Sequence, residues 1–308
     1  MAAKFYAYYV SGSTAILTDA LESIINVVAA AFAYYSVYLA SLPRDLNHPY
    51  GHGKIEFFAS GLEGVLILLA SAYIFLHASQ HLIATPSLVR LDLGMYISLG
   101  SAFLNGMMGF YLVRIGKSSH SPTLVADGKH LTLDAYNGLL IVLALGITFF
   151  TQWIWVDAVA SLIFALLMCW QGIRLIRESV AALMDETNPA VFNKVIEWIT
   201  QHQKPTWIDL HNLRIQQYGG DLHIDCHVTL PRYWDLSRVH DEIHDFEVTM
   251  GQVLPTEIEI FVHVDPCLDA CCSHCEISDC PIRTHAFSNK IEWTAKNMAL
   301  NQKHFNEL

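Results

Sequence analysis

Long apolar stretches alternate with short polar loops over residues 1–184 of the chain. Five of these stretches are each long enough for a helix that crosses the roughly 30 Å hydrocarbon core of a bilayer. They lie at 14–40, 57–84, 92–113, 131–152 and 155–176. A shorter apolar piece at 1–10 covers only about 15 Å, half of that thickness. We therefore expect an α-helical polytopic membrane domain of the six-helix type with a truncated first helix.

The pattern after residue 184 is that of a small soluble α+β domain. An amphipathic helix at 189–203 precedes two alternating strands, 208–217 and 221–230. Gly219-Gly220 joins the strands and is a strong hairpin signal. A second helix at 236–250 and a third strand at 257–264 complete an α-β-β-α-β order. The expected domains are thus a membrane domain at 1–184, an α+β domain at 185–266 and a cysteine-rich tail at 267–308.

Positive charge in the short loops predicts which helix ends face the cytoplasm. Basic residues follow the first and last long stretches and precede the fourth. They are Arg44, Lys54, Arg114, Lys117, Lys129, Arg174 and Arg177. We therefore expect a multi-pass protein of the cell inner (plasma) membrane whose C-terminal domain is cytoplasmic.

Composition supports this division. The chain is 53% apolar and only 15% charged, which is typical of a protein that meets lipid. Almost all of the acidic excess behind the net charge of -11 lies after residue 185, and no basic face indicates a nucleic-acid partner. Sixteen histidines are many, and imidazole is the commonest protein ligand for transition metals.

Two pairs of polar residues interrupt the apolar stretches. Glu22 and Asn26 lie four residues apart on one helix face, and His130 and Asp134 repeat that spacing in a later stretch. Two helices that each offer two ligands can supply a four-coordinate metal site. Polar groups are costly inside a membrane, so a functional role as metal ligands is the favoured interpretation of these residues. The alternative is that they only make polar contacts with another helix.

The loop after 14–40 carries a carboxylate and two imidazoles, Asp45, His48 and His52, which can close around one ion. Taken alone, a solvated histidine-rich loop is about as good an interpretation. The α+β domain adds further ligand-type residues where its elements can converge. These are His211, His227, His240, His263 and Asp265. Any one of them alone is better explained as an ordinary surface or core residue.

Five of the seven cysteines lie between Cys267 and Cys280. In the cytoplasm they stay reduced, so they are interpreted as metal ligands rather than disulfides. The four that are spaced x4, x2, x4 can wrap one tetrahedral ion, and soft thiolates favour zinc there. They are Cys267, Cys272, Cys275 and Cys280. A redox-sensitive or iron–sulfur element is the alternative.

Residues 1–266 resemble the cation diffusion facilitator family, proton-coupled antiporters similar to bacterial ferrous-iron and zinc efflux proteins. Four ordered motifs carry the resemblance: Ser11-Gly-Ser13 through Thr18-Asp19-Ala20, His48-Pro-Tyr-Gly-His52-Gly-Lys54, His130-x-x-x-Asp134, and Val262-His263-Val-Asp265-Pro266. The resemblance implies a ferredoxin-like cytoplasmic domain that forms a homodimer, and a charge pair between Lys54 and Asp185. It also implies that the three ligand sets outside the tail bind transported or regulatory metal.

The expected function is therefore efflux of Zn²⁺ or another divalent transition metal, with inward protons exchanged for outward metal ions. Glu22 and Asn26 depart from the usual family pair, and this harder ligand set leans toward iron, manganese or cobalt. A membrane-anchored metal sensor or scaffold without transport is the alternative. An enzyme is not expected, since no His-Glu-x-x-His or nucleophile motif occurs.

Overall fold

The computed structural model describes residues 1–84, 90–118, 122–253 and 258–306. The chain folds as two compact units. One comprises Met1–Tyr35 and Ala59–Ser179, and the other Ser36–Phe58 and Val180–Leu308. The loop between the second and third helices therefore belongs to the same unit as the C-terminal domain.

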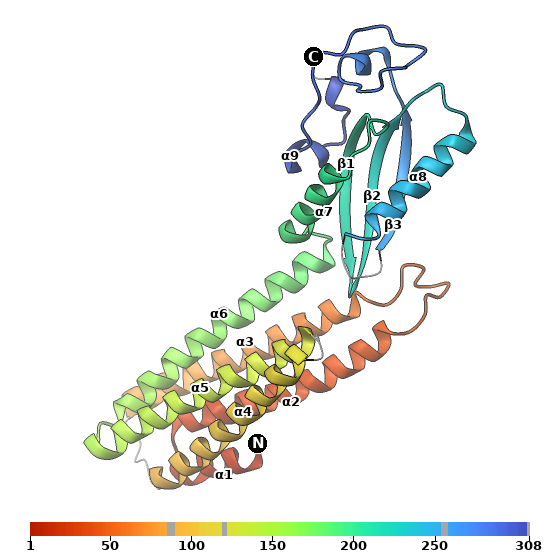
Figure 1. Ribbon diagram of the computed structural model, residues 1–308. Coiled ribbons are helices and arrows are strands. Elements are labelled where there is room, and N and C mark those ends of the chain that lie inside the picture. The colour runs from red at the N-terminus through yellow and green to blue at the C-terminus, as the bar shows by residue number, and fades with distance from the viewer. Residues whose placement is uncertain (85–89, 119–121, 254–257, 307–308) are drawn as a thin grey trace. The chain divides into compact units, whose positions relative to one another are not determined.

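The first unit is helical (Figure 1). Its helices, some of which extend into the second unit, are α1 Ala2–Ser11, α2 Thr14–Ala40, α3 Ile55–Ala84, α4 Leu91–Ser118, α5 Pro122–Thr151 and α6 Trp155–Leu183. Within the described residues, all of these except α1 are long and apolar enough to cross a membrane, which confirms the five predicted spans.

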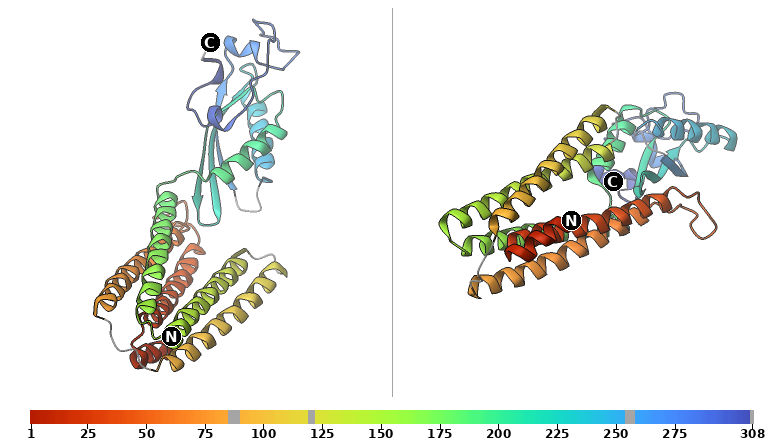
Figure 2. Two further views of the ribbon diagram at one scale, coloured as in Figure 1. Left: turned by 90° about the vertical axis from the view of Figure 1, so that its left-hand side faces the viewer. Right: turned by 90° about the horizontal axis from the view of Figure 1, so that it is seen from below.

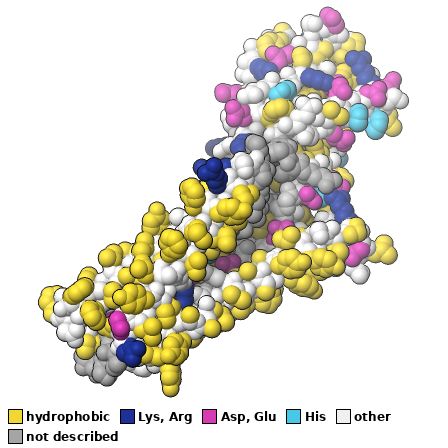
Figure 3. Space-filling view, turned by 60° about the horizontal axis from the view of Figure 1, so that its bottom comes forward, with side chains coloured by type: hydrophobic (Ala, Val, Ile, Leu, Met, Phe, Trp, Pro, Cys, Tyr) yellow, Lys and Arg dark blue, Asp and Glu magenta, His cyan; other side chains and the backbone are white. Residues whose placement is uncertain are grey.

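Large apolar side chains cover the outside of this unit. Phe103, Phe110 and Trp170 are more than half exposed, and hydrophobic side chains spread over the helices in Figure 3. The interior is built from smaller clusters around residues such as Ile16 and Ile74. This inverted distribution is the one expected where lipid rather than water surrounds the helices.

Helices α4 and α5 lie side by side as an antiparallel pair (Figures 1 and 2). Two facing glycines allow their backbones to approach. A Cβ atom added at Gly128 would lie 2.6 Å from the Val113 backbone nitrogen and 2.8 Å from the Gly109 oxygen. Small residues at such contacts are the usual basis of helix packing in membranes.

The start of α2 is held by a buried carboxylate of α6. Asp157 is 1% exposed and accepts hydrogen bonds from the Ser13 hydroxyl at 2.5 Å and from both the backbone nitrogen and the hydroxyl of Thr14 at 2.8 Å. A negative charge at a helix N-terminus is favourable because the backbone N–H groups there are unpaired. The Ser-Gly-Ser motif therefore positions α2, the helix that carries Glu22 and Asn26.

The second unit contains the predicted α+β domain. Its elements are α7 Pro189–Gln201, β1 Asp209–Tyr218, β2 Asp221–Leu230, α8 Leu236–Met250 and β3 Ile258–Pro266, which confirms the α-β-β-α-β order. β2 is the central strand, antiparallel to β1 and parallel to β3. Glu257, the predicted start of the third strand, lies outside the described residues.

Helices α7 and α8 pack on one face of the sheet (Figure 2). The Trp198 ring nitrogen of α7 donates a hydrogen bond to the backbone oxygen of Thr249 in α8.

The tail after β3 contributes to the core of this domain. Trp293 and Met298, the latter in the short helix α9 Ala295–Met298, are buried in the same cluster as Trp207 and Phe246. The backbone of Asn212 also donates a hydrogen bond of 2.8 Å to the Leu300 oxygen. The tail thus packs against the sheet domain through apolar contacts as well as through its cysteines.

Replacing Trp293, which is 5% exposed, by alanine should destabilise the sheet domain by about 3–5 kcal/mol, because the cavity left in the core cannot fully collapse. Amide hydrogen exchange in β1 and β2 should then accelerate by about 100-fold or more, since each 1.4 kcal/mol is a factor of ten. Phe287→Ala, a tail aromatic that is 48% exposed, is the matched control and should leave exchange nearly unchanged. Equal exchange in both variants would show that the tail does not support the domain.

Candidate metal sites

Two of the predicted intramembrane residues, Asn26 and His130, lie beside the Asp134 carboxylate. Asn26 of α2 donates a hydrogen bond of 3.0 Å to Asp134 Oδ2, and the Nε2 atom of His130 lies 3.8 Å from the same oxygen. Asp134 is 8% exposed. The fourth residue, Glu22, is hydrogen-bonded to Asn137 of α5. The hydrogen bond between Asn26 and Asp134 joins α2 to α5. Among the described residues, Glu22, His130 and Asp134 do not form a group whose ligand atoms all lie within 4.8 Å of one another.

Two charged residues near this site were not predicted. Lys4 of α1 is buried, and its Nζ atom lies 2.7 Å from Asp19 Oδ1 and donates a hydrogen bond of 2.8 Å to the Ser23 hydroxyl. Glu63 of α3 interacts electrostatically with His130. A lysine inside the apolar stretch 1–10 was the available signal for Lys4, since an ionisable residue there needs a partner.

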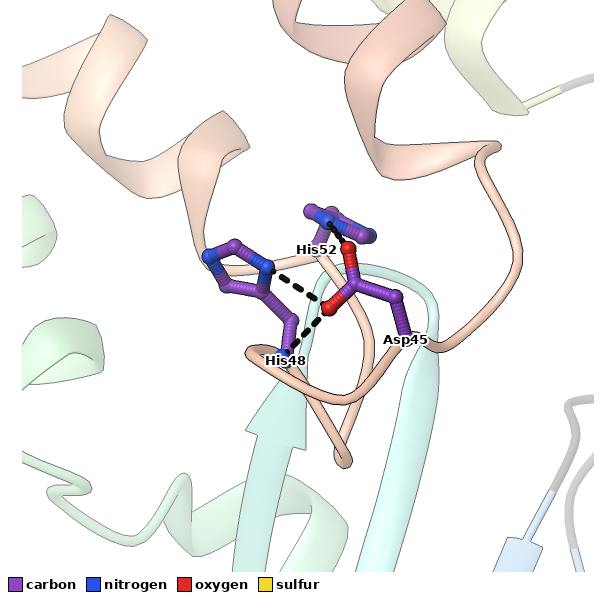
Figure 4. Close-up of side chains that lie close together, drawn as sticks. All are labelled: Asp45, His48 and His52. Carbon is purple, nitrogen blue, oxygen red and sulfur yellow. Dashed lines mark hydrogen bonds and ion pairs between the residues drawn. The ribbon is translucent and has the colours of Figure 1, made fainter.

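The loop between α2 and α3 forms a preassembled cluster (Figure 4). Asp45 Oδ1 lies 3.1 Å from His48 Nδ1, and Asp45 Oδ2 lies 3.5 Å from His52 Nε2. All three ligand atoms lie within 4.8 Å of one another. The backbone hydrogen bond from His48 is the main cause that lowers the pKa of the Asp45 carboxyl, so Asp45 is ready to bind a cation at neutral pH.

The loop packs against the hairpin that joins β1 to β2. A Cβ atom added at Gly53 would lie 2.3 Å from the Tyr218 backbone oxygen, so only glycine fits there. The Lys54 Nζ atom lies 2.8 Å from Asp185 Oδ1 and 4.5 Å from the centre of the Tyr218 ring. Burial opposes the Lys54 charge, but Asp185 outweighs it and raises the pKa of Lys54. The charge pair implied by the resemblance is thus present in the structure.

A second preassembled cluster lies on the sheet. His211 of β1, His227 of β2 and Asp265 of β3 have ligand atoms within 4.8 Å of one another. Asp265 Oδ2 lies 3.5 Å from His211 Nε2 and 3.4 Å from His227 Nδ1. The strand register explains this, because His211 pairs with His227, and β2 runs parallel to β3 beside it. Burial and the neighbouring imidazoles lower the pKa of His227, which favours the neutral form that binds metal.

The other two predicted residues of the sheet domain lie differently. The His263 ring centre is 4.6 Å from that of His227, so His263 adjoins the cluster. His240 is exposed on α8 and, within the described residues, is not part of either three-residue group. The structure therefore brings His211, His227 and Asp265 together and leaves His240 outside.

Three residues around this cluster were missed by sequence reasoning. The buried Asp209 carboxylate contacts His211 Nδ1 at 3.2 Å and pairs with the His304 ring. Burial alone would raise the pKa of Asp209, but these two histidines lower it to about 2. Lys303 Nζ lies 3.1 Å from Asp265 Oδ1. Asp209 could have been found, since it shares a strand face with His211, whereas no local signal places Lys303 or His304.

All four predicted cysteines of the tail line one small pocket, together with Cys271. Among the described residues, no three of their sulfur atoms are grouped within 4.8 Å of one another. The structure thus places these thiols around a common space without closing them around a point.

Comparison with known proteins agrees with this architecture. The family profile of the cation efflux transmembrane domain matches residues 1–184, and that of the cation efflux protein cytoplasmic domain matches residues 188–267. An uncharacterized transporter of Synechocystis, sll1263, is 33% identical over 87% of this chain and 86% of its own length. The manganese efflux system protein MneP of Bacillus subtilis is 25% identical over 86% of this chain and 91% of its own length. The cation-efflux pump FieF of Escherichia coli is 24% identical over 86% of this chain and 87% of its own length.

The two profile matches together span nearly the whole region that contains the helices, the loop cluster and the sheet cluster. The chain therefore belongs to the cation diffusion facilitator family of metal-efflux transporters, as a multi-pass membrane protein with a cytoplasmic C-terminal domain.

Proposed function

We propose that the chain, as a homodimer, exports a divalent transition-metal ion in exchange for protons by alternating access. The observation that supports this best is the position of Asp134 of α5. Its carboxylate accepts a hydrogen bond from Asn26 of α2 and lies beside His130, one turn away in α5. An anionic group inside the membrane with polar neighbours on two helices suits a cation that binds between them. Glu22 completes the proposed transport set.

Proton coupling follows from the chemistry of these ligands. His130 and the carboxylates must be deprotonated to bind a metal ion, and they take up protons again when the ion leaves. In the structure, the ammonium group of Lys4 supplies a positive charge beside Asp19. A divalent ion brings two further positive charges into the same low-dielectric region, so proton release on binding keeps the local charge nearly constant.

Zinc is the metal proposed first, from the resemblance of the sequence motifs to the cation diffusion facilitator family and its ferrous-iron and zinc efflux proteins. The amide of Asn26 and the carboxylates of Glu22 and Asp134 are hard oxygen donors, which suit manganese and ferrous iron as competing substrates. The name of the relative MneP refers to manganese efflux. A comparison of zinc, manganese and iron flux in the same liposomes ranks them.

The two clusters outside the helical unit are proposed to bind regulatory metal. Each offers one carboxylate and two imidazoles, Asp45 with His48 and His52, and Asp265 with His211 and His227. Such clusters would also suit a sensor without transport. An anchor, however, needs no ligands between α2 and α5, so the intramembrane residues favour transport.

Asp134→Asn should reduce metal flux into or out of proteoliposomes by roughly 100-fold or more, a larger loss than the 10–100-fold typical of removing an outer-shell partner. The reason is that the amide keeps the shape of the side chain but removes the charge that binds the cation. Flux is measured with a metal-sensitive dye under an imposed proton gradient.

Asp92→Asn is the matched control, since Asp92 is an exposed carboxylate at the start of α4. Its flux should match that of the unchanged protein. Equal flux in both variants would remove Asp134 from the transport site.

Lys303→Gln should tighten zinc binding at the sheet cluster by about fivefold, because the ammonium group now pairs with Asp265 and competes with the ion for it. A fivefold change corresponds to about 1 kcal/mol, the upper end of the range for an ion pair that solvent can still reach, and the two side chains are 18% and 16% exposed. Zinc titrations in the presence and absence of His227→Ala isolate this site by difference.

Lys204→Gln is the control for Lys303, since Lys204 pairs with Asp245 at 3.0 Å on an exposed part of the domain. It should leave the affinity unchanged. Unchanged affinity in Lys303→Gln as well would show that Lys303 does not compete with the ion.

A further inference from the structure

The tail forms a pocket whose walls carry five thiols. Cys267 directly follows β3, Cys271 and Cys272 lie in the 3-10 turn Asp269–Ser273, and Cys275 and Cys280 lie in the irregular segment after that turn. The remaining lining residues come partly from the sheet domain itself. Among them are Ile208, Pro231, Arg232 and Tyr233. The pocket is therefore built between the domain and the tail, and filling it would join the two.

Hydrogen-bond donors point at the sulfur atoms. The backbone nitrogen of Arg232 lies 3.4 Å from Cys267 Sγ, and the Thr284 hydroxyl lies 3.5 Å from Cys272 Sγ. Such donors stabilise thiolates, and they are a regular feature around sulfur ligands of metal centres.

One arginine holds the loop that carries the central Cys272 and Cys275. The guanidinium of Arg283 donates to the backbone oxygens of Cys272 at 2.8 Å, Cys275 at 2.9 Å and Ile277 at 2.5 Å. Because one guanidinium group binds three backbone carbonyl oxygens, the backbone of this segment curves around Arg283. This positions Cys272 and Cys275 toward the same pocket without regular secondary structure after the turn.

Cys271 differs from the other four. It is 1% exposed and packs with Ile208 and Phe305 in a small apolar cluster, and its sulfur accepts a hydrogen bond from the Leu268 backbone nitrogen at 3.1 Å. Cys275, at 5% exposed, belongs to the same cluster and Cys267 packs against it, so what sets Cys271 apart is that it lies outside the x4, x2, x4 spacing of the other four and is the most buried of the five. Four thiols remain, which is the number that a thiolate-bound metal centre requires.

We propose that Cys267, Cys272, Cys275 and Cys280 bind a metal centre through four thiolates, a site separate from the transport residues. Either a single zinc ion or an iron–sulfur cluster has this ligand chemistry. With Zn–S bonds of about 2.3 Å, a zinc ion would draw the sulfurs to about 3.8 Å from one another. A cluster holds some of its thiolates further apart, because they bind different irons. Both centres fasten the tail to the sheet domain, two residues along the chain from Asp265.

The test is metal and sulfide analysis of the purified full-length dimer in detergent, prepared under reducing and anaerobic conditions. The comparison protein is the double variant Cys272→Ser with Cys275→Ser. The control is Cys169→Ser, which removes a thiol of α6 outside the pocket. Iron with acid-labile sulfide, or one additional zinc per chain, should be present in the unchanged protein and in the control and should be lost in the double variant. Equal metal and sulfide content in all three overturns the proposal.

A second measurement needs no substitution and so does not depend on how the double variant folds. Thiol alkylation of the native protein is followed by mass spectrometry before and after treatment with a strong metal chelator. The four ligand cysteines should be protected first and should react at least tenfold faster after the metal is removed. Alkylation rates that do not change with the chelator would contradict a thiolate-bound centre.

Discussion

The cost of keeping the Asp134 carboxylate inside a low-dielectric helical unit is the constraint on which the rest of that unit depends. The structure meets it with an amide from α2 and an imidazole from α5, while Lys4 of α1 pairs with Asp19 one turn from Glu22. These partners fix how α1, α2 and α5 must meet. The Asp157 hydrogen bonds hold the same helix at its N-terminal end. A cation that enters this region replaces contacts that the protein already makes, so binding, protonation and helix position are linked in the proposed cycle.

The two clusters outside the helical unit reach the same ligand chemistry in different ways. Asp45, His48 and His52 lie within eight residues of one another, and a glycine-containing loop is enough to gather them. His211, His227 and Asp265 come from three strands and meet only because of the sheet register. The loop cluster is thus expected to form wherever its loop is ordered, whereas the sheet cluster requires the folded domain. Lys303 adds a further condition, since the tail must also be in place for its ammonium group to reach Asp265.

Much of the fold could be predicted from the sequence because its signals are local. The five spans follow from the length of apolar stretches, and the order of the sheet domain follows from alternation and the Gly219-Gly220 turn. The loop cluster is similarly local. What could not be predicted depends on contacts distant in sequence: Lys303 with Asp265, His304 with Asp209, and Trp293 in the domain core. His240 is exposed on α8, and its place in the predicted ligand set stays a prediction.

The measurement that tests the central claim most directly records metal flux and internal pH together in proteoliposomes that contain the unchanged protein. The account predicts that metal moves against its own gradient when a proton gradient is imposed, that protons flow in the opposite direction, and that dissipating the proton gradient stops the uphill movement. Metal flux that is absent, or that proceeds at the same rate with no proton movement, would contradict it.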